Sequence, residues 1–195
     1  MTGFATDSLT LDVKSTRLTD EQFFELCSAN RELRFERSAA GELIIMAPTA
    51  WGTGNQNAEI SGQLWAWNRQ TRLGKVFDSS TGFRLANGAD RSPDASWVSK
   101  DRLEALNADP AKFLPLAPDF VVELRSQSDA LKPLQTKMQE YIDNGVRLGW
   151  LIDSKNQRVE IYRLGQEVEV LESPVSLSGE DVLPGFSLDL SPLWA

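Results

Sequence analysis

The feature that most constrains the fold is a short strand that has no polar face. Residues 120–124 read Phe-Val-Val-Glu-Leu and stand between Pro118 and the polar stretch 126–129. Apolar side chains at both odd and even positions of a strand indicate that both of its faces are covered. Such a strand belongs inside a sheet with helices on either side, so the chain is predicted to form an α/β structure.

Neighbouring segments supply the rest of this architecture. Residues 94–98 and 148–152 are predicted as further strands, and apolar residues at every third or fourth position predict helices over 57–72 and 128–143. The expected fold class is α/β, with a central mixed β-sheet flanked by helices on opposite or adjacent faces. Because 195 residues suit one domain and no linker divides them, we expect a single domain over 1–195.

Shorter elements surround this core. A helix is predicted after Thr19, which can form a capping box with Gln22. Alternating apolar and polar residues predict a hairpin from 33–37 and 42–46. Further short strands or helices are predicted at 76–79, 83–85, 102–106 and 158–163.

A glycine pair in the loop predicted over 48–54 resembles a phosphate-binding loop. Gly52-Thr53-Gly54 precedes the helix over 57–72, but Asn57 stands where the third glycine of that motif belongs, and no Gly-Lys-Ser/Thr follows. The two interpretations are a nucleotide cradle and a flexible entry into the helix, and the incomplete motif favours the second.

The chain contains no histidine and one cysteine, Cys27. This composition excludes a Ser-His-Asp triad, a Cys-His pair, a histidine-held haem, a structural zinc site and an internal disulfide. Acid–base or metal chemistry must therefore come from Asp, Glu, Lys or Tyr. Without a basic partner of the usual kind, Cys27 is predicted as a small core residue.

The net charge of −8 argues against a broad surface that coats nucleic acid regardless of sequence. No Lys or Arg follows Arg163, so the last part of the chain is strongly acidic. Eight basic residues of the first half form either a local basic groove or a set of solvated surface charges: Arg31, Arg34, Arg37, Arg69, Arg72, Lys75, Arg84 and Arg91.

Two further expectations concern location and assembly. Residues 1–7 lack a secretory pattern and no stretch approaches the ~20 apolar residues that a bilayer requires, so we expect a cytoplasmic protein without a membrane segment. Six tryptophans are more than a small core readily buries. A homodimer is expected on this ground, with Trp194 as the candidate contact.

Two carboxylates stand out because of their surroundings. Glu123 lies within the apolar strand, where an unpaired charge would cost several kcal/mol. Asp94 follows Pro93 and leads into the strand over 94–98. The two side chains either converge on a divalent cation such as Mg²⁺, or Glu123 pairs with a nearby Lys or Arg while Asp94 caps a turn.

Five motifs stand in order along the chain, at residues 92–98, 118–126, 137–141, 144–146 and 149–153. So arranged, the sequence resembles the Uma2 family, formerly a domain of unknown function. Its members are restriction-endonuclease-like proteins with the PD-(D/E)xK nuclease fold. The resemblance covers a core over 18–163 and leaves 164–195 as an acidic C-terminal extension.

The resemblance implies a role for each matching residue. Asp94 and Glu123 would be catalytic and bind Mg²⁺ or Mn²⁺, and Glu59 would be an additional helical carboxylate. Arg125 stands where the family's lysine is expected, and because arginine stays protonated it can hold a phosphate but not act as a base. Lys137, on the next helix, would take over the role of the lysine.

Two more residues would bind substrate. Tyr141 is four residues after Lys137 and so shares its helix face, and Arg84 lies in a matching segment. The structural alternative for Lys137 is an edge residue whose stem covers apolar surface.

The function implied is a Mg²⁺-dependent endonuclease that hydrolyses DNA phosphodiester bonds. The alternatives are a weak or inactive nuclease-fold module that binds nucleic acid or a protein, and a hydrolase of a small phosphorylated substrate. None of the three requires histidine.

Overall fold

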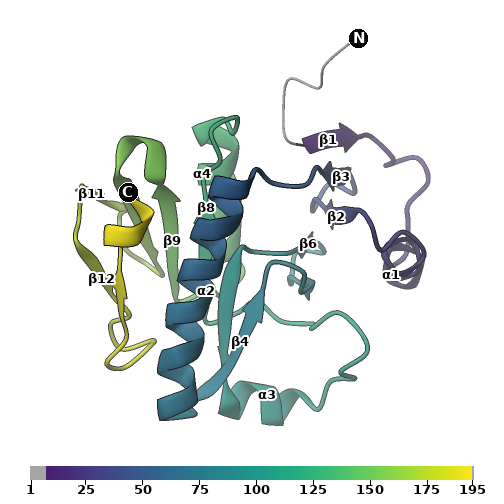
Figure 1. Ribbon diagram of the computed structural model, residues 1–195. Helices are drawn as coiled ribbons and strands as arrows, with labels where there is room; N and C mark the ends of the chain where they lie inside the picture. The colour runs from purple at the N-terminus through teal and green to yellow at the C-terminus, as the bar shows by residue number, and fades with distance from the viewer. Residues whose placement is uncertain (1–7, 195) are drawn as a thin grey trace.

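A computed structural model describes residues 8–194 of the chain (Figure 1). Its main element is a six-stranded sheet in the order β11-β10-β9-β8-β7-β4. β8 and β9 are parallel, whereas β8 and β7 are antiparallel, so the predicted mixed sheet is confirmed. Its strands are β4 (Gly74–Asp78), β7 (Ala95–Ser99), β8 (Phe120–Leu124), β9 (Leu148–Asp153), β10 (Arg158–Arg163) and β11 (Glu169–Glu172).

Two long helices cover opposite faces of this sheet. Ile60 and Leu64 of α2 (Trp51–Thr71) belong to the same apolar cluster as Val122 of β8. Residues of α4 (Leu131–Asp143) belong to a second cluster, which contains Val121. Successive strand residues point to opposite faces, so α2 and α4 lie on opposite sides of β8, as predicted.

Gly149 of β9 permits the close approach of α4. A Cβ atom at this position would lie 2.6 Å from Cε of Met138, a buried residue of α4. The missing side chain therefore lets α4 lie directly on β9. Lys137, the residue before Met138, is thereby held close to the end of β8.

The C-terminal segment completes the cluster on the α2 side. It forms the hairpin of β12 (Ser176–Ser178) and β13 (Ser187–Asp189), followed by the short helix η2 (Ser191–Leu193). The region expected as an acidic extension thus contributes to the core with its apolar residues, which include Leu177, Val182, Leu183, Phe186, Leu188, Leu190 and Leu193.

The exposure of the tryptophans differs from expectation. Trp194, the residue expected at a partner surface, packs against its own chain, and its Nε1 donates to the Pro174 carbonyl at 2.8 Å. Among the tryptophans of the described part, Trp51 and Trp65 are the most exposed, at 90% and 56%. Both belong to α2.

A second sheet lies beside the first, in the order β1-β3-β2-β6-β5 (Figure 1). The hairpin predicted over 33–46 forms β2 and β3, and the predicted capping box of Thr19 and Gln22 begins α1. The remaining elements are β1 (Ser8–Leu11), α1 (Asp20–Ala29), β2 (Arg34–Arg37), β3 (Leu43–Met46), β5 (Phe83–Arg84), β6 (Asp90–Arg91), α3 (Lys100–Leu106) and η1 (Ser154–Asn156).

Both long helices begin at residues other than those expected. α2 starts at Trp51, so the glycines at 52 and 54 lie in its first turns rather than in a loop. α4 starts at Leu131, three residues after the start expected at 128, and its N-cap is Ala130. The Asp129 carboxylate instead accepts a hydrogen bond from the Ser126 amide at 2.9 Å, which forms a separate turn before the helix.

No helix among residues 8–194 is both long and apolar enough to cross a membrane.

Candidate active site

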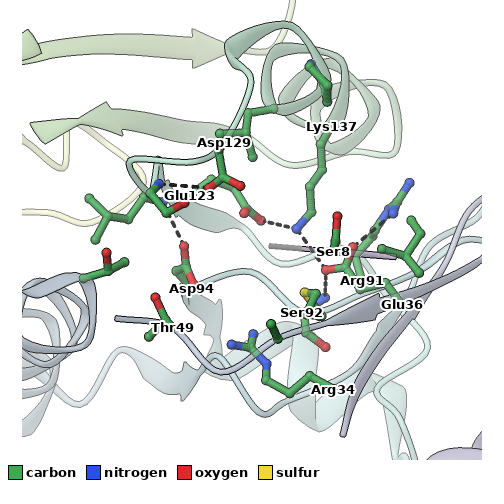
Figure 2. A pocket seen from close by; sticks show the side chains of 18 of the residues that line it. Ser8, Arg34, Glu36, Thr49, Arg91, Ser92, Asp94, Glu123, Asp129 and Lys137 are labelled. Carbon is green, nitrogen blue, oxygen red and sulfur yellow. Dashed lines mark hydrogen bonds and ion pairs between the residues drawn. The ribbon is translucent and has the colours of Figure 1, made fainter. Parts of the chain in front are cut away.

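A cavity of about 360 Å³ lies where the two sheets meet α4 (Figure 2). Its walls come from β2 and β3 of the small sheet, from the ends of α2 and β8, and from the exposed edge of α4. Asp94, Glu123 and Lys137 all line it. The structure therefore brings together three of the residues to which the sequence assigned a catalytic role.

The register of β7 and β8 places the two carboxylates next to each other. Ala95 pairs with Val122, so one step further along the antiparallel strands Asp94 comes beside Glu123 on the same face. The Asp94 Oδ2 atom accepts a hydrogen bond from the Leu124 amide at 2.9 Å. This bond holds the aspartate at the end of β8.

Lys137 reaches the same place from α4. Its Nζ lies 2.9 Å from Oε1 of Glu123 and 2.9 Å from Oε1 of Glu36, as Figure 2 shows. One turn later, the hydroxyl of Tyr141 donates to Oε1 of Glu123 at 2.9 Å. Lys137 and Tyr141 thus share a helix face, as their spacing predicts, and Glu123 has the basic partner that its burial requires.

Burial dominates the ionisation of this cluster. Burial and the charge of Asp94 raise the pKa of Glu123 to about 7, against the opposing effect of Lys137. Burial also raises the pKa of Asp94. Burial would lower the pKa of Lys137, but Glu123 and Glu36 outweigh it and the pKa is raised. A fixed ammonium group therefore lies beside a carboxyl group that titrates near neutral pH.

Glu36 is a member of the cluster that the sequence did not reveal. It is only 3% exposed and accepts hydrogen bonds from the Ser92 amide and from Arg91 Nη1, each at 3.0 Å. Burial would raise its pKa, but Lys137 and Arg91 outweigh this effect and the pKa of Glu36 is lowered. In the hairpin pattern this glutamate has the spacing of a surface residue, and its partner Lys137 is distant in sequence.

Four residues assigned to the site do not line the cavity, and three of them have other partners. The Glu59 carboxylate accepts a hydrogen bond from Gln63 at 3.1 Å. Arg84 forms ion pairs with two aspartates of the small-sheet region, and Arg125 pairs with Asp153 at 2.6 Å. None of these three residues is among the described residues that line the cavity, and neither is Tyr141, which was expected to bind substrate but contacts Glu123 instead.

Asn57 occupies the place on α2 that Glu59 was expected to fill. Its Nδ2 donates to Oδ1 of Asp94 at 3.3 Å, and it lines the cavity. Its Oδ1 is buried and has no hydrogen-bond partner within residues 8–194. A buried acceptor without a donor is rare in a folded protein and indicates a site for a ligand or a water molecule.

The donor atoms around Asp94 are suited to a hard cation. Within the described residues no three His, Cys, Asp or Glu side chains form a group that could hold a metal ion. Mg²⁺, however, is commonly bound by one or two carboxylates, with waters and substrate oxygens completing its shell. Asp94, Glu123 and the free amide oxygen of Asn57 fit that requirement.

Comparisons with known proteins bear on the family and the fold of this chain. The Uma2 family, described as "Putative restriction endonuclease", matches residues 20–191. A crystal structure of "a putative nuclease belonging to DUF820" from Anabaena variabilis is similar with a TM-score of 0.70 and 20% identity, over 84% of this chain and 90% of that one. No curated protein matches the sequence. Because the family match spans most of its length and the fold agrees, the chain belongs to the Uma2 family.

Proposed function

We propose that this protein is an endonuclease that hydrolyses DNA phosphodiester bonds with the help of Mg²⁺ or Mn²⁺. The observation that carries the proposal is the position of Lys137, whose ammonium group meets Glu123 in the cavity that Asp94 also lines. Two carboxylates can hold the metal ion that assists phosphodiester hydrolysis, and a lysine beside them can stabilise the negative charge of the phosphate.

In this proposal Asp94 and Glu123 hold the metal ion, and Asn57 adds its amide oxygen. When bound, the metal polarises a phosphoryl oxygen and lowers the pKa of a coordinated water. Tyr141 keeps one oxygen of Glu123 in place through its hydroxyl group. The aspartate is held in turn by the Leu124 amide, so both carboxylates are oriented before any ligand arrives.

Lys137 acts as a fixed positive charge. Its raised pKa keeps the amine protonated, and two carboxylates hold it in one position. An ammonium group held in this way can stabilise the negative charge that develops on a phosphate during hydrolysis. Arg125 is unsuited to this role because its guanidinium is turned to Asp153.

The test is a plasmid cleavage assay with Mg²⁺ or Mn²⁺. Lys137→Ala should lower the rate by roughly 10²–10³, the loss typical of one preorganised charge-stabilising donor. Lys132→Ala is the matched control, because Lys132 is an exposed lysine on the same helix, and it should cleave as the wild type does. Equal rates for the Lys137 and Lys132 variants would refute the role of Lys137. A wild type that binds DNA but never cleaves it would identify a binding module instead.

A further inference from the structure

The side chain of Arg34 lines the cavity, and its guanidinium has a hydrogen-bond donor without a partner among the described residues. Arg34 belongs to β2 of the small sheet, and its Nη2 donates to the Ser79 carbonyl at 2.7 Å. Its Nε is buried and has no hydrogen-bond partner within residues 8–194. Leaving such a donor unpaired costs about 1–3 kcal/mol, so it calls for a functional explanation.

The other cations of the cavity are already neutralised. Arg91 contacts Glu36 at 3.0 Å and Glu140 at 2.6 Å. Lys137 is held between two carboxylates, as described above. Arg34, by contrast, forms no ion pair within 4.0 Å with any carboxylate in the described range. It is therefore the basic side chain of this cavity that remains available for an anionic ligand.

The position of Arg34 also fits the neighbouring groups. Figure 2 shows its guanidinium extended toward the side of the cavity where Asp94 and Thr49 lie, away from Lys137. Its charge is close enough to lower the pKa of Asp94 against the larger effect of burial. The cavity thus presents an unpaired donor on Arg34 and an unpaired acceptor on Asn57. An anion and a cation bound together would satisfy both atoms.

We propose that Arg34 binds a phosphate group of the substrate. This inference rests on the proposed function and names the substrate-binding residue of the same site. Guanidinium N–H groups donate strongly to phosphate oxygens, and with Nη2 bonded to the Ser79 carbonyl the Nε–H of Arg34 is left as an unpaired donor for such an oxygen. The anchor on Ser79 fixes the side chain before the ligand binds, which reduces the entropy lost on binding.

The test measures binding without cleavage. Fluorescence anisotropy of a short labelled DNA oligonucleotide in EDTA compares the wild type with Arg34→Ala, Arg34→Lys and the control Arg31→Ala, whose arginine is exposed nearby. Arg34→Ala should weaken binding roughly 10- to 100-fold, as expected for lost charge-assisted hydrogen bonds. The affinity of Arg34→Lys should fall between those of the wild type and Arg34→Ala, because lysine keeps the charge but loses the Nε–H donor. Arg31→Ala should bind as the wild type does.

Competition with inorganic phosphate and with a nucleoside monophosphate separates two sources of the phosphate. Stronger binding of the oligonucleotide assigns Arg34 to a DNA strand, and stronger binding of the small competitors assigns it to a small phosphorylated substrate. Either result supports the proposal only if Arg34→Ala loses that binding. Equal affinities of the wild type and Arg34→Ala for every probe, or no binding of any probe, would overturn it.

A failure of this phosphate-binding proposal can be distinguished from a failure of the proposed endonuclease function. A wild type that binds through Arg34 but does not cleave with Mg²⁺ or Mn²⁺ contradicts the endonuclease and leaves the phosphate site intact. A wild type that cleaves while Arg34→Ala retains both its affinity and its KM contradicts the phosphate site alone. Melting temperatures of both Arg34 variants show whether a loss of binding reflects a loss of fold.

Discussion

Replacement of Glu123 by glutamine should stabilise the protein at alkaline pH and not at acidic pH. The pKa of Glu123 rises from its ordinary value of 4.5 to about 7 in the folded chain, chiefly because of burial. The folded state therefore holds a proton more tightly than the unfolded state does. The stability gained from this proton is fully present below pH 4.5 and is lost as the pH rises through about 7.

The size of the effect follows from the same values. One pKa unit corresponds to about 1.4 kcal/mol, so the loss amounts to about 3 kcal/mol once the pH is well above 7. Glu123→Gln has no such titration. Its free energy of unfolding relative to the wild type should therefore increase by up to about 3 kcal/mol between pH 5 and pH 8.5.

Urea unfolding at a series of pH values measures this difference directly. Glu59→Gln is the matched control, because that glutamate is partly buried on α2 and lies outside the cavity. Its stability relative to the wild type should not follow the same pH trend. A Glu123→Gln variant that is less stable than the wild type by the same amount at every pH would refute the reasoning. The assay requires neither metal nor substrate, so it tests the site without testing catalysis.

Three further outcomes are expected. In calorimetric titrations Mn²⁺ should bind the wild type more tightly than it binds Asn57→Ala. The affinity of the wild type for Mn²⁺ should also rise as the pH increases toward 7, because protonated Glu123 is a poor ligand. An affinity that is independent of pH would contradict this expectation. Gly149→Ala should lower the free energy of unfolding by about 1–3 kcal/mol, because the added Cβ overlaps α4. Gly62→Ala is the control: this glycine of α2 has open space around it, so the variant should not be destabilised. The homodimer was expected through Trp194, but Trp51 and Trp65 are the more exposed tryptophans, so we expect light scattering to give a mass above the 21.7 kDa of one chain. A mass of 21.7 kDa would contradict the homodimer.

Local patterns allowed the core of the fold to be predicted from the sequence. The strand over 120–124 has the bounds that its apolar run and flanking breakers indicate. Lys137 was assigned through the resemblance to the Uma2 family, and its helix does follow this strand and pack back against the sheet. For Asp94 and Glu123 the spacing left two alternatives open, and only the observed register of β7 and β8 places the two residues side by side.

Contacts between the two sheets were not predictable in this way. Glu36 has the alternation of a solvent-facing residue, but in the fold Lys137, Arg91 and the Ser92 amide surround its carboxylate. Asn57 was missed because the glycines before it obscured the start of α2, so its orientation toward Asp94 could not be derived. Arg125 was assigned from its spacing to Glu123, but spacing gives no information about Asp153, which attracts its side chain from another strand.

The C-terminal hairpin has a consequence for synthesis of the protein on the ribosome. Residues 177–193 cover the face of the large sheet next to α2, and they are the last part of the fold to be made. Until they emerge, apolar side chains of β8 and β9 on that face remain open to solvent. A nascent chain in this condition is prone to aggregate or to engage chaperones. The fold is therefore completed only after residue 193 has left the ribosome, although most of the large sheet is made earlier.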